Sequence, residues 1–318
     1  MNKRKWRGVP PPRFGIIWDK QMKTVKIKAY AKVNLTLEIV GQSGGYHLLD
    51  SLVASVDIFD VIVLKKRKDK LSSVIMKGLG SESIPPEQNN ALKAAEAFSA
   101  RYGVCGADIT VFKNIPMGAG LGGSSADASG VLLGMAKLYG IDDKAGLDEI
   151  ANSLGSDVKY MLSGGFARMQ GRGDCIQNLN VSPTLYMLMI VPQTGVSSGA
   201  CYHEFDNNPI RVKQGATQNC IDALAKNDIN GAGMYLANDL YPPSARLCTD
   251  VEKAYAEALA FSPLGVVMTG SGSAVLALFE TKELCEWAQS RYRGKFKTAV
   301  IKTVIPKQEK LLKNPFVL

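Results

Sequence analysis

The chain has 318 residues, which is enough for about two domains of roughly 150 residues each. Its composition, 46% hydrophobic and 21% charged, is that of an ordinary soluble globular protein. The longest apolar run, residues 185–191, is too short to span a bilayer, and cysteines without C-x-x-C pairs predict a reducing, cytoplasmic compartment and no structural zinc site.

Much of the net charge of +9 lies in one segment, residues 1–21, which carries +5 and leaves +4 for the rest. A solvated tail is the usual interpretation of such a basic run. Because this segment has a Pro-Pro-Pro break and no hydrophobic period, we expect a disordered extension outside the domains, with Met22 as the true start. The remaining charge suits an anionic substrate.

Strand patterns begin at residue 25. Apolar residues fill the odd positions of 25–29 and 33–39, and polar residues stand between them, which is the alternation of a half-buried strand. Lys32 and Asn34 therefore share the face away from the core. Residues 44–47, Gly-Gly-Tyr-His, predict a turn, and residues 51–64 predict further strands. From the residues alone, Lys32 is most often simply solvated, and Tyr46 and His47 are most often surface packing.

A helix is predicted next, from a start signal at residues 86–90. Its apolar side is formed by Leu92, Ala95, Phe98 and Tyr102. Asn90 at its start would be a plain helix cap.

Residues 113–138 form a glycine-rich turn that leads directly into an apolar helix. Ser124 would cap this helix, with Asp127 as its capping-box partner. The buried stripe would consist of Ala128, Val131, Leu132, Met135 and Leu138. Free N–H groups, the positive helix end and the Ser124 and Ser125 hydroxyls together predict an anion site. The residues whose missing Cβ lets the backbone approach an anion are Gly118, Gly120, Gly122 and Gly123.

Other interpretations of this loop fit less well. The glycines satisfy the dinucleotide fingerprint G-x-G-x-x-G, with Asp142 as the ribose acid, but no second strand follows the helix. A Walker A motif would need a lysine where Ser124 stands. The H-R-D and D-F-G motifs of protein kinases are absent from the sequence. A glycine-rich turn without a ligand remains the alternative.

Two further segments complete the prediction. A helix with Leu147, Ile150, Ala151 and Leu154 ends at Gly155, and Asp157 follows, in the ordinary position of a cap. Residues 185–191 predict a buried strand near the start of a second domain. Between apolar strands, residues 269–273, Thr-Gly-Ser-Gly-Ser, can either place backbone N–H groups against an anion or form a simple hairpin turn.

The glycine-rich loop resembles the phosphate loop of the GHMP kinases. The matching residues are Pro116, Gly118, Gly120, Leu121, Gly122, Gly123, Ser124, Ser125 and Ala126. Residues 31–35 (A-K-V-N-L), 154–158 (L-G-S-D-V), 164–168 and 171–174 are similar to the branch of this family that phosphorylates 4-diphosphocytidyl-2-C-methyl-D-erythritol in isoprenoid synthesis. The resemblance extends from Met22 to nearly the end of the chain.

The resemblance implies an α+β, two-domain kinase, with domains at 22–178 and 179–318 and with ATP and substrate in the cleft between them. Asp157 becomes the catalytic acid-base residue, and Lys32 would offset charge that develops during phosphoryl transfer to the 2-hydroxyl. The loop would hold the ATP phosphates, with Asn90 and Lys113 near the adenine. Mg²⁺ would be bound mainly through ATP, with Ser125 as a candidate ligand.

The same resemblance assigns the substrate side. Tyr46 and His47 would hold the cytosine, with Tyr202, in a substrate loop, as the other wall of an aromatic sandwich. The remaining substrate-binding residues would be Asn34, Gly270, Ser271 and Gly272. Two departures from the branch are Gly44, where an aspartate is usual, and residues 159–161, Lys-Tyr-Met, in place of Pro-Phe-Phe.

Alternatives stay open at this point. The chain could be another GHMP kinase, of the homoserine or mevalonate type, although Tyr46, His47 and Tyr202 favour a substrate with a base. It could also be a catalytically silent nucleotide- or RNA-binding relative, although the presence of both Lys32 and Asp157 argues against this. We expect no nucleic-acid or membrane partner, and either a monomer or a homodimer.

Overall fold

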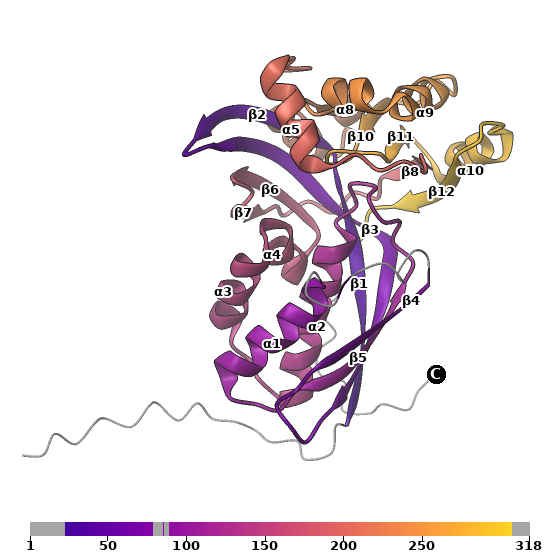
Figure 1. Cartoon of the computed structure of the whole chain (residues 1–318). Coiled ribbons are helices and arrows are strands. Elements are labelled where there is room, and N and C mark those ends of the chain that lie inside the picture. Colours follow the sequence, from indigo (N-terminus) through magenta and orange to yellow (C-terminus); the bar gives the residue numbers. More distant parts are fainter. Residues whose placement is uncertain (1–22, 79–84, 86–88, 307–318) are drawn as a thin grey trace, which may run out of the picture.

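The computed structural model describes residues 23–78, 85 and 89–306. The predicted N-terminal extension and Met22 lie outside the described residues. Two sheets and the helices packed on them account for these residues (Figure 1).

The larger sheet has eight strands in the order β4-β5-β3-β2-β9, with β1 and β6 also paired to β3, and β7 paired to β6. Its pairs are antiparallel except for β4 with β5 and β2 with β9. The strands are β1 (Thr24–Asn34), β2 (Thr36–Ser43), β3 (Tyr46–Lys66), β4 (Ser73–Gly78), β5 (Ala107–Lys113), β6 (Phe166–Gly171), β7 (Cys175–Asn178) and β9 (Ala237–Asn238).

Strand β3 organises this sheet. The sequence predicts several strands after the turn at residues 44–47, but the structure has one strand of 21 residues that begins at Tyr46. Its first half pairs with β2 and β6, and its second half pairs with β1 and β5. The register of β1 against β3 shifts between Tyr30 and Lys32, so β1 is irregular just before the first predicted catalytic residue.

The helices between residues 90 and 163 cover one face of this sheet (Figure 1). Helix α2 lies against β1 and β3, and the other three pack around it. Glycines allow its close approach: a Cβ at Gly130 would lie 2.5 Å from Ile62 Cδ1, and one at Gly134 would lie 2.3 Å from Leu64 Cδ1. All five residues of the predicted stripe are buried. The helices are α1 (Asn90–Tyr102), α2 (Gly123–Tyr139), α3 (Lys144–Leu154) and α4 (Ser156–Ser163).

The smaller sheet is antiparallel, with the order β10-β11-β8-β12, and it contains the predicted buried strand as β8. Helices α9 and α10 pack on its strands. The remaining elements are β8 (Tyr186–Val191), α5 (Ser198–Asn207), α6 (Ala216–Ala225), α7 (Ile229–Met234), α8 (Tyr241–Leu247), α9 (Thr249–Leu259), β10 (Gly265–Met268), β11 (Val275–Phe279), α10 (Lys282–Arg291) and β12 (Lys297–Lys302).

The two sheets meet around the end of β1 and the start of β2. Residues 24–30 keep the alternation of a half-buried strand, whereas residues 31–39 are buried on both faces. Asn34, on the face predicted to point away from the core, is covered by the loop between β10 and β11. The predicted boundary at residue 178 falls between β7 and β8, although β9 returns to the larger sheet, and it stays a prediction. Among the described helices, none is both long and apolar enough to cross a membrane.

Candidate active site

Lys32 and Asp157 face each other across the site, as the sequence predicts. The Lys32 ammonium lies 3.5 Å from the Asp157 carboxylate and 2.7 Å from Asn34 Oδ1. Asp157 stands in the first turn of α4, and the cap position is occupied by Gly155 rather than by Asp157. Its carboxylate faces Lys32 instead. The lysine side chain is 7% exposed and the aspartate side chain is 35% exposed, so the pair opens toward solvent on the aspartate side.

Asn34 connects the site to the smaller sheet. Its Oδ1 accepts hydrogen bonds from Lys32 Nζ and, at 3.1 Å, from the backbone N–H of Gly270. Its Nδ2 donates to Ser51 Oγ at 2.8 Å, and its backbone N–H donates to Thr269 Oγ1 at 2.9 Å. A single side chain thus fixes the lysine and the Gly-Ser loop relative to each other. The sequence did not single out Ser51 or Thr269.

The glycine-rich loop runs beside this lysine. Lys32 N–H donates to the Leu121 carbonyl at 3.1 Å, and a Cβ at Gly122 would lie 2.5 Å from Met161 Cε. The first bond of α2 runs from Ala126 N–H to the Gly122 carbonyl, so the three N–H groups before Ala126 have no partner within the helix. This donor set fits the phosphates of a nucleotide.

The capping box predicted for this helix is wrong. The cap position is taken by Gly122, with φ +70° and no side-chain hydrogen bond, and Ser124 lies inside the first turn. The Ser124 hydroxyl, exposed, instead accepts a hydrogen bond from Asn90 Nδ2 at 3.0 Å. Asn90 is not the cap of α1 either, because Asn89 caps that helix. Asn90 and Ser124 therefore lie together at the mouth of the loop, where Ser125 is half-buried.

The Lys113 ammonium is buried beside the phosphate loop, 3.4 Å from where a Cβ on Gly123 would lie. Its ammonium is 3% exposed and is paired with Asp60 and, at 2.7 Å, with Asp127. Burial lowers the pKa of Lys113, but attraction to the two carboxylates outweighs burial and holds that pKa above its usual value. Its predicted contact with adenine stays a prediction. Asp60 was missed because it is 53 residues from Lys113, whereas Asp127 was assigned to a capping box instead.

This buried cluster joins the two ends of the phosphate loop. Asp60 accepts the N–H groups of Asn114 and Ile115, just before the loop. Asp127 stands on α2, just after the loop, and within the described structure its Oδ1 has no hydrogen-bond partner. Burial raises the pKa of Asp127 to about 7, against the opposing effect of Lys113 and with a further increase from Asp60.

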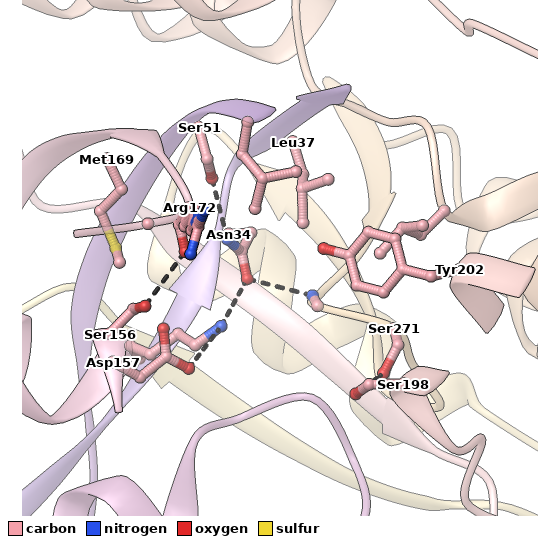
Figure 2. A pocket seen from close by; sticks show the side chains of 15 residues that line it. Asn34, Leu37, Ser51, Ser156, Asp157, Met169, Arg172, Ser198, Tyr202 and Ser271 are labelled. Carbon is pink, nitrogen blue, oxygen red and sulfur yellow. Dashed lines mark hydrogen bonds and ion pairs between the residues drawn. The ribbon is translucent and has the colours of Figure 1, made fainter. Parts of the chain in front are cut away.

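A cavity of about 150 Å³ opens in front of the Lys32–Asp157 pair (Figure 2). Its walls combine the end of β1, the start of α4 and the loop between β10 and β11. Residues 269–274 of that loop connect two antiparallel strands, so the hairpin interpretation is right as well, but the loop also packs into the site. The lining includes Asn34, Ser51, Arg172, Tyr202, Gly270 and Ser271.

The Gly-Ser loop is fixed from behind. Ser271 Oγ lies 2.8 Å from Ser198 Oγ, and its carbonyl accepts a hydrogen bond from Ser244 Oγ at 3.0 Å. Asn238 Nδ2 donates to the Gly270 carbonyl at 2.8 Å. Gly272 does not line the cavity; a Cβ there would meet Met268 Sδ at 2.9 Å. The loop therefore presents Gly270 and Ser271 to the cavity.

The predicted base-binding residues lie close together, but His47 and Tyr202 stack directly on each other. Tyr202 lies on helix α5 rather than on a loop, and its ring stacks on His47 with centroids 4.7 Å apart. His47 Nε2 lies 2.7 Å from Asp206 Oδ1. Tyr46, 57% exposed, carries the Arg172 guanidinium on its ring. Each tyrosine thus already has a stacking partner on one face, and a base would use the remaining faces. Burial raises the pKa of Tyr202 to about 12, so its hydroxyl is a neutral donor.

Residues 89–167 match the GHMP kinases N terminal domain, and residues 220–297 match the GHMP kinases C terminal domain. The 4-diphosphocytidyl-2-C-methyl-D-erythritol kinase of Caldanaerobacter subterraneus subsp. tengcongensis is 34% identical over 295 residues, which cover 91% of this chain and 99% of that protein. The kinase of the same name from Caldicellulosiruptor saccharolyticus is 33% identical over 281 residues, which cover 87% and 96%.

Solved structures agree with these relatives. A crystal structure of 4-(cytidine 5'-diphospho)-2C-methyl-D-erythritol kinase superimposes with a TM-score of 0.72 at 27% identity, over 87% of this chain and 98% of that one. Homoserine kinase from Cytophaga hutchinsonii shares the fold, with a TM-score of 0.71 at 19% identity and coverage of 92% and 98%. The predicted fold class, an α+β two-domain GHMP kinase, is confirmed. The chain belongs to the GHMP kinase family, in the branch of the 4-diphosphocytidyl-2-C-methyl-D-erythritol kinases.

Proposed function

We propose that the protein transfers the γ-phosphoryl group of ATP to the 2-hydroxyl of 4-diphosphocytidyl-2-C-methyl-D-erythritol. The observation that carries this proposal is the pair of Lys32 and Asp157 at 3.5 Å, which lines one cavity next to a free helix N-terminus. Phosphoryl transfer needs a carboxylate that orients the hydroxyl, a cation that offsets negative charge and a site that holds the phosphates. We infer the acceptor from the relatives, which are 4-diphosphocytidyl-2-C-methyl-D-erythritol kinases.

Each residue has a definite role in the proposed reaction. The acceptor oxygen attacks the γ-phosphorus, the bond from this phosphorus to the bridging oxygen breaks, and ADP leaves. Asp157 orients the hydroxyl and accepts its proton. Lys32 offsets negative charge on the attacking oxygen and on the transferred group, and Asn34 Oδ1 holds its ammonium in place at 2.7 Å.

The phosphate loop holds the co-substrate. The N–H groups of residues 123–125 and the positive end of α2 would bind its β- and γ-phosphates, with Asn90 and Ser124 at the loop mouth. Mg²⁺, when bound, neutralises phosphate charge. The described residues offer no cluster of three or more His, Cys, Asp or Glu side chains for a metal, so we assign Mg²⁺ to the phosphates, with the Ser125 hydroxyl as the candidate protein ligand.

We also place the reaction in the cytoplasm. ATP is its co-substrate, and all six cysteines are free thiols. Four of these thiols are buried, as expected for small core residues, whereas Cys175 is exposed and Cys105 is half-buried.

The test is ADP release with Mg-ATP and a panel of acceptors: the cytidyl compound, homoserine, mevalonate and galactose. We expect turnover of the cytidyl compound alone. Turnover of homoserine or mevalonate instead would confirm that the protein is a kinase but would show that the proposed acceptor is wrong. Silence on the whole panel, with ATP still bound, would remove the proposal.

A further inference from the structure

Arg172 carries a charge for which the described residues supply no counter-charge. Three of the 15 residues that line the cavity are charged, namely Lys32, Asp157 and Arg172 (Figure 2). Lys32 and Asp157 pair with each other. Within residues 23–78 and 89–306, the Arg172 guanidinium forms no ion pair; it lies over the ring of Tyr46, with its central carbon 4.0 Å from the ring centre. A cavity with an unpaired guanidinium favours an anionic ligand.

The position of Arg172 links the two ends of the cavity. Its carbonyl accepts a hydrogen bond from Ser156 Oγ at 3.0 Å, and Ser156 directly precedes Asp157. Its guanidinium reaches the other way, to Tyr46 at the start of β3. The side chain therefore spans the interval between the proposed phosphoryl-transfer end and the proposed base-binding end.

The backbone around Arg172 is held in place. Its N–H donates to Asp174 Oδ1 at 3.0 Å, and the N–H of Gly173 donates to the Gln170 carbonyl at 3.1 Å. Lys159, one of the departures from the family pattern, donates to the Asp174 carbonyl at 3.4 Å. A fixed turn lowers the entropic cost of placing the guanidinium on a ligand.

Gly44 leaves the guanidinium uncovered. A Cβ at Gly44 would lie 3.4 Å from Arg172 Nη2, so any side chain at this position would reach the guanidinium. A carboxylate there would neutralise it. With glycine, the N–H groups remain available.

We infer that Arg172 binds the diphosphate of the acceptor and thereby selects a nucleoside-diphosphate ester over a neutral alcohol. This inference rests on the proposed function, which places the reacting hydroxyl at Asp157 and the base near Tyr46. The diphosphate joins those two parts of the substrate, and Arg172 lies between them. The planar guanidinium provides paired N–H donors that match phosphate oxygens.

Kinetics of Arg172→Gln give the first test. We expect the KM for the cytidyl acceptor to rise ~10- to 100-fold, as for the loss of a charge-assisted contact, with a smaller change in kcat and an unchanged KM for ATP. Arg172→Lys should recover part of the loss, because it restores the charge without the paired geometry. An unchanged acceptor KM in Arg172→Gln overturns the inference.

Two matched substitutions at Gly44 test the role of the Arg172 charge without changing Arg172 itself. Gly44 has φ +57°, a left-handed conformation that both Asp and Asn can adopt. Gly44→Asp should raise the acceptor KM by neutralising the guanidinium, whereas Gly44→Asn should raise it much less. Equal effects of the two variants would mean that the side chain only blocks space, and would count against the role of Arg172.

Direct binding separates this inference from the proposed function. With the ATP site filled by a non-hydrolysable analogue, calorimetry should show that the wild type binds CDP more tightly than cytidine, and that Arg172→Gln removes this preference. If the wild type does not turn over the cytidyl acceptor, the proposed function is wrong. The preference of the wild type for CDP over cytidine still tests the role of Arg172 in that case. Equal weakening of CDP and cytidine in Arg172→Gln would make Arg172 a support for Tyr46 and would refute the inference.

Discussion

Gly120 and Thr269 lie so close that a Cβ on the glycine would be 2.0 Å from the threonine carbonyl oxygen. Thr269 Oγ1 also donates to the Gly120 carbonyl at 3.2 Å. The contact joins the phosphate loop to the Gly-Ser loop across 149 residues of sequence. The relative position of the two loops therefore depends on the absence of a side chain at Gly120.

Gly120→Ala should separate the two loops. Gly120 also has φ +76°, so the substitution adds backbone strain to the clash, and we expect a loss of about 1–3 kcal/mol in stability, a higher KM for ATP and a lower kcat. Gly118→Ala is the matched comparison, because φ is +64° there but the nearest atom to its Cβ would be 3.6 Å away. Urea unfolding and ADP release check both variants. Equal effects would show that strain alone, not the contact with Thr269, matters.

Asp157→Asn should separate chemistry from nucleotide binding. The amide can no longer take the proton of the acceptor, so we expect kcat to fall ~10²- to 10⁴-fold, while ATP affinity measured by nucleotide titration stays close to that of the wild type. The exposed Asp142, the acid of the dinucleotide alternative, gives the control: Asp142→Asn should be neutral. Equal loss of turnover and of ATP binding in Asp157→Asn would make this residue structural.

Asn34→Ala should affect both loops and the lysine together. It leaves Lys32, Ser51 and the Gly270 N–H each without one partner. We expect a loss of about 1–3 kcal/mol in unfolding free energy, because buried polar groups become unsatisfied, and a fall in kcat beyond that of Ser51→Ala. Chemical denaturation and steady-state kinetics measure the two effects. A variant that keeps full turnover would show that Lys32 holds its position without Asn34.

The sequence predicts the parts of the site that follow from local pattern. Alternation along residues 25–39 places Lys32 and Asn34 on one face, and the glycines of residues 118–123 mark the anion site. These features depend on neighbours a few positions apart.

The remaining parts depend on contacts that sequence spacing does not encode. Gly270 reaches Asn34 across 236 residues, and Lys113 is turned inward by Asp60, which is 53 residues away. Tyr202 lies on a helix because residues 198–207 pack against α8, which no local signal indicates. Arg172 was missed because its stacking partner, Tyr46, lies far away in the sequence, at the start of β3.

The buried carboxylate of Asp127 should make stability depend on pH. Its pKa is raised from 3.8 to about 7, because burial and the neighbouring Asp60 carboxylate outweigh the opposing effect of Lys113. Between about pH 4 and pH 7 the folded protein therefore keeps a proton that the unfolded chain has released. The contribution of Asp127 to the free energy of unfolding is fully present below pH 4. It decreases as the pH rises to 7, by up to ~1.4 kcal/mol per pH unit.

Asp127→Asn isolates this effect. The amide is isosteric and does not titrate, so the unfolding free energy of the wild type, relative to the variant, should fall between pH 4.5 and pH 7 and then level off. Urea unfolding at several pH values measures the difference, and Asp142→Asn should show no such trend, because that side chain is exposed. A wild-type stability that instead rises relative to Asp127→Asn over this range would mean that attraction to Lys113 exceeds the cost of burial, and that the cluster holds the phosphate loop as a fully ionised ion pair.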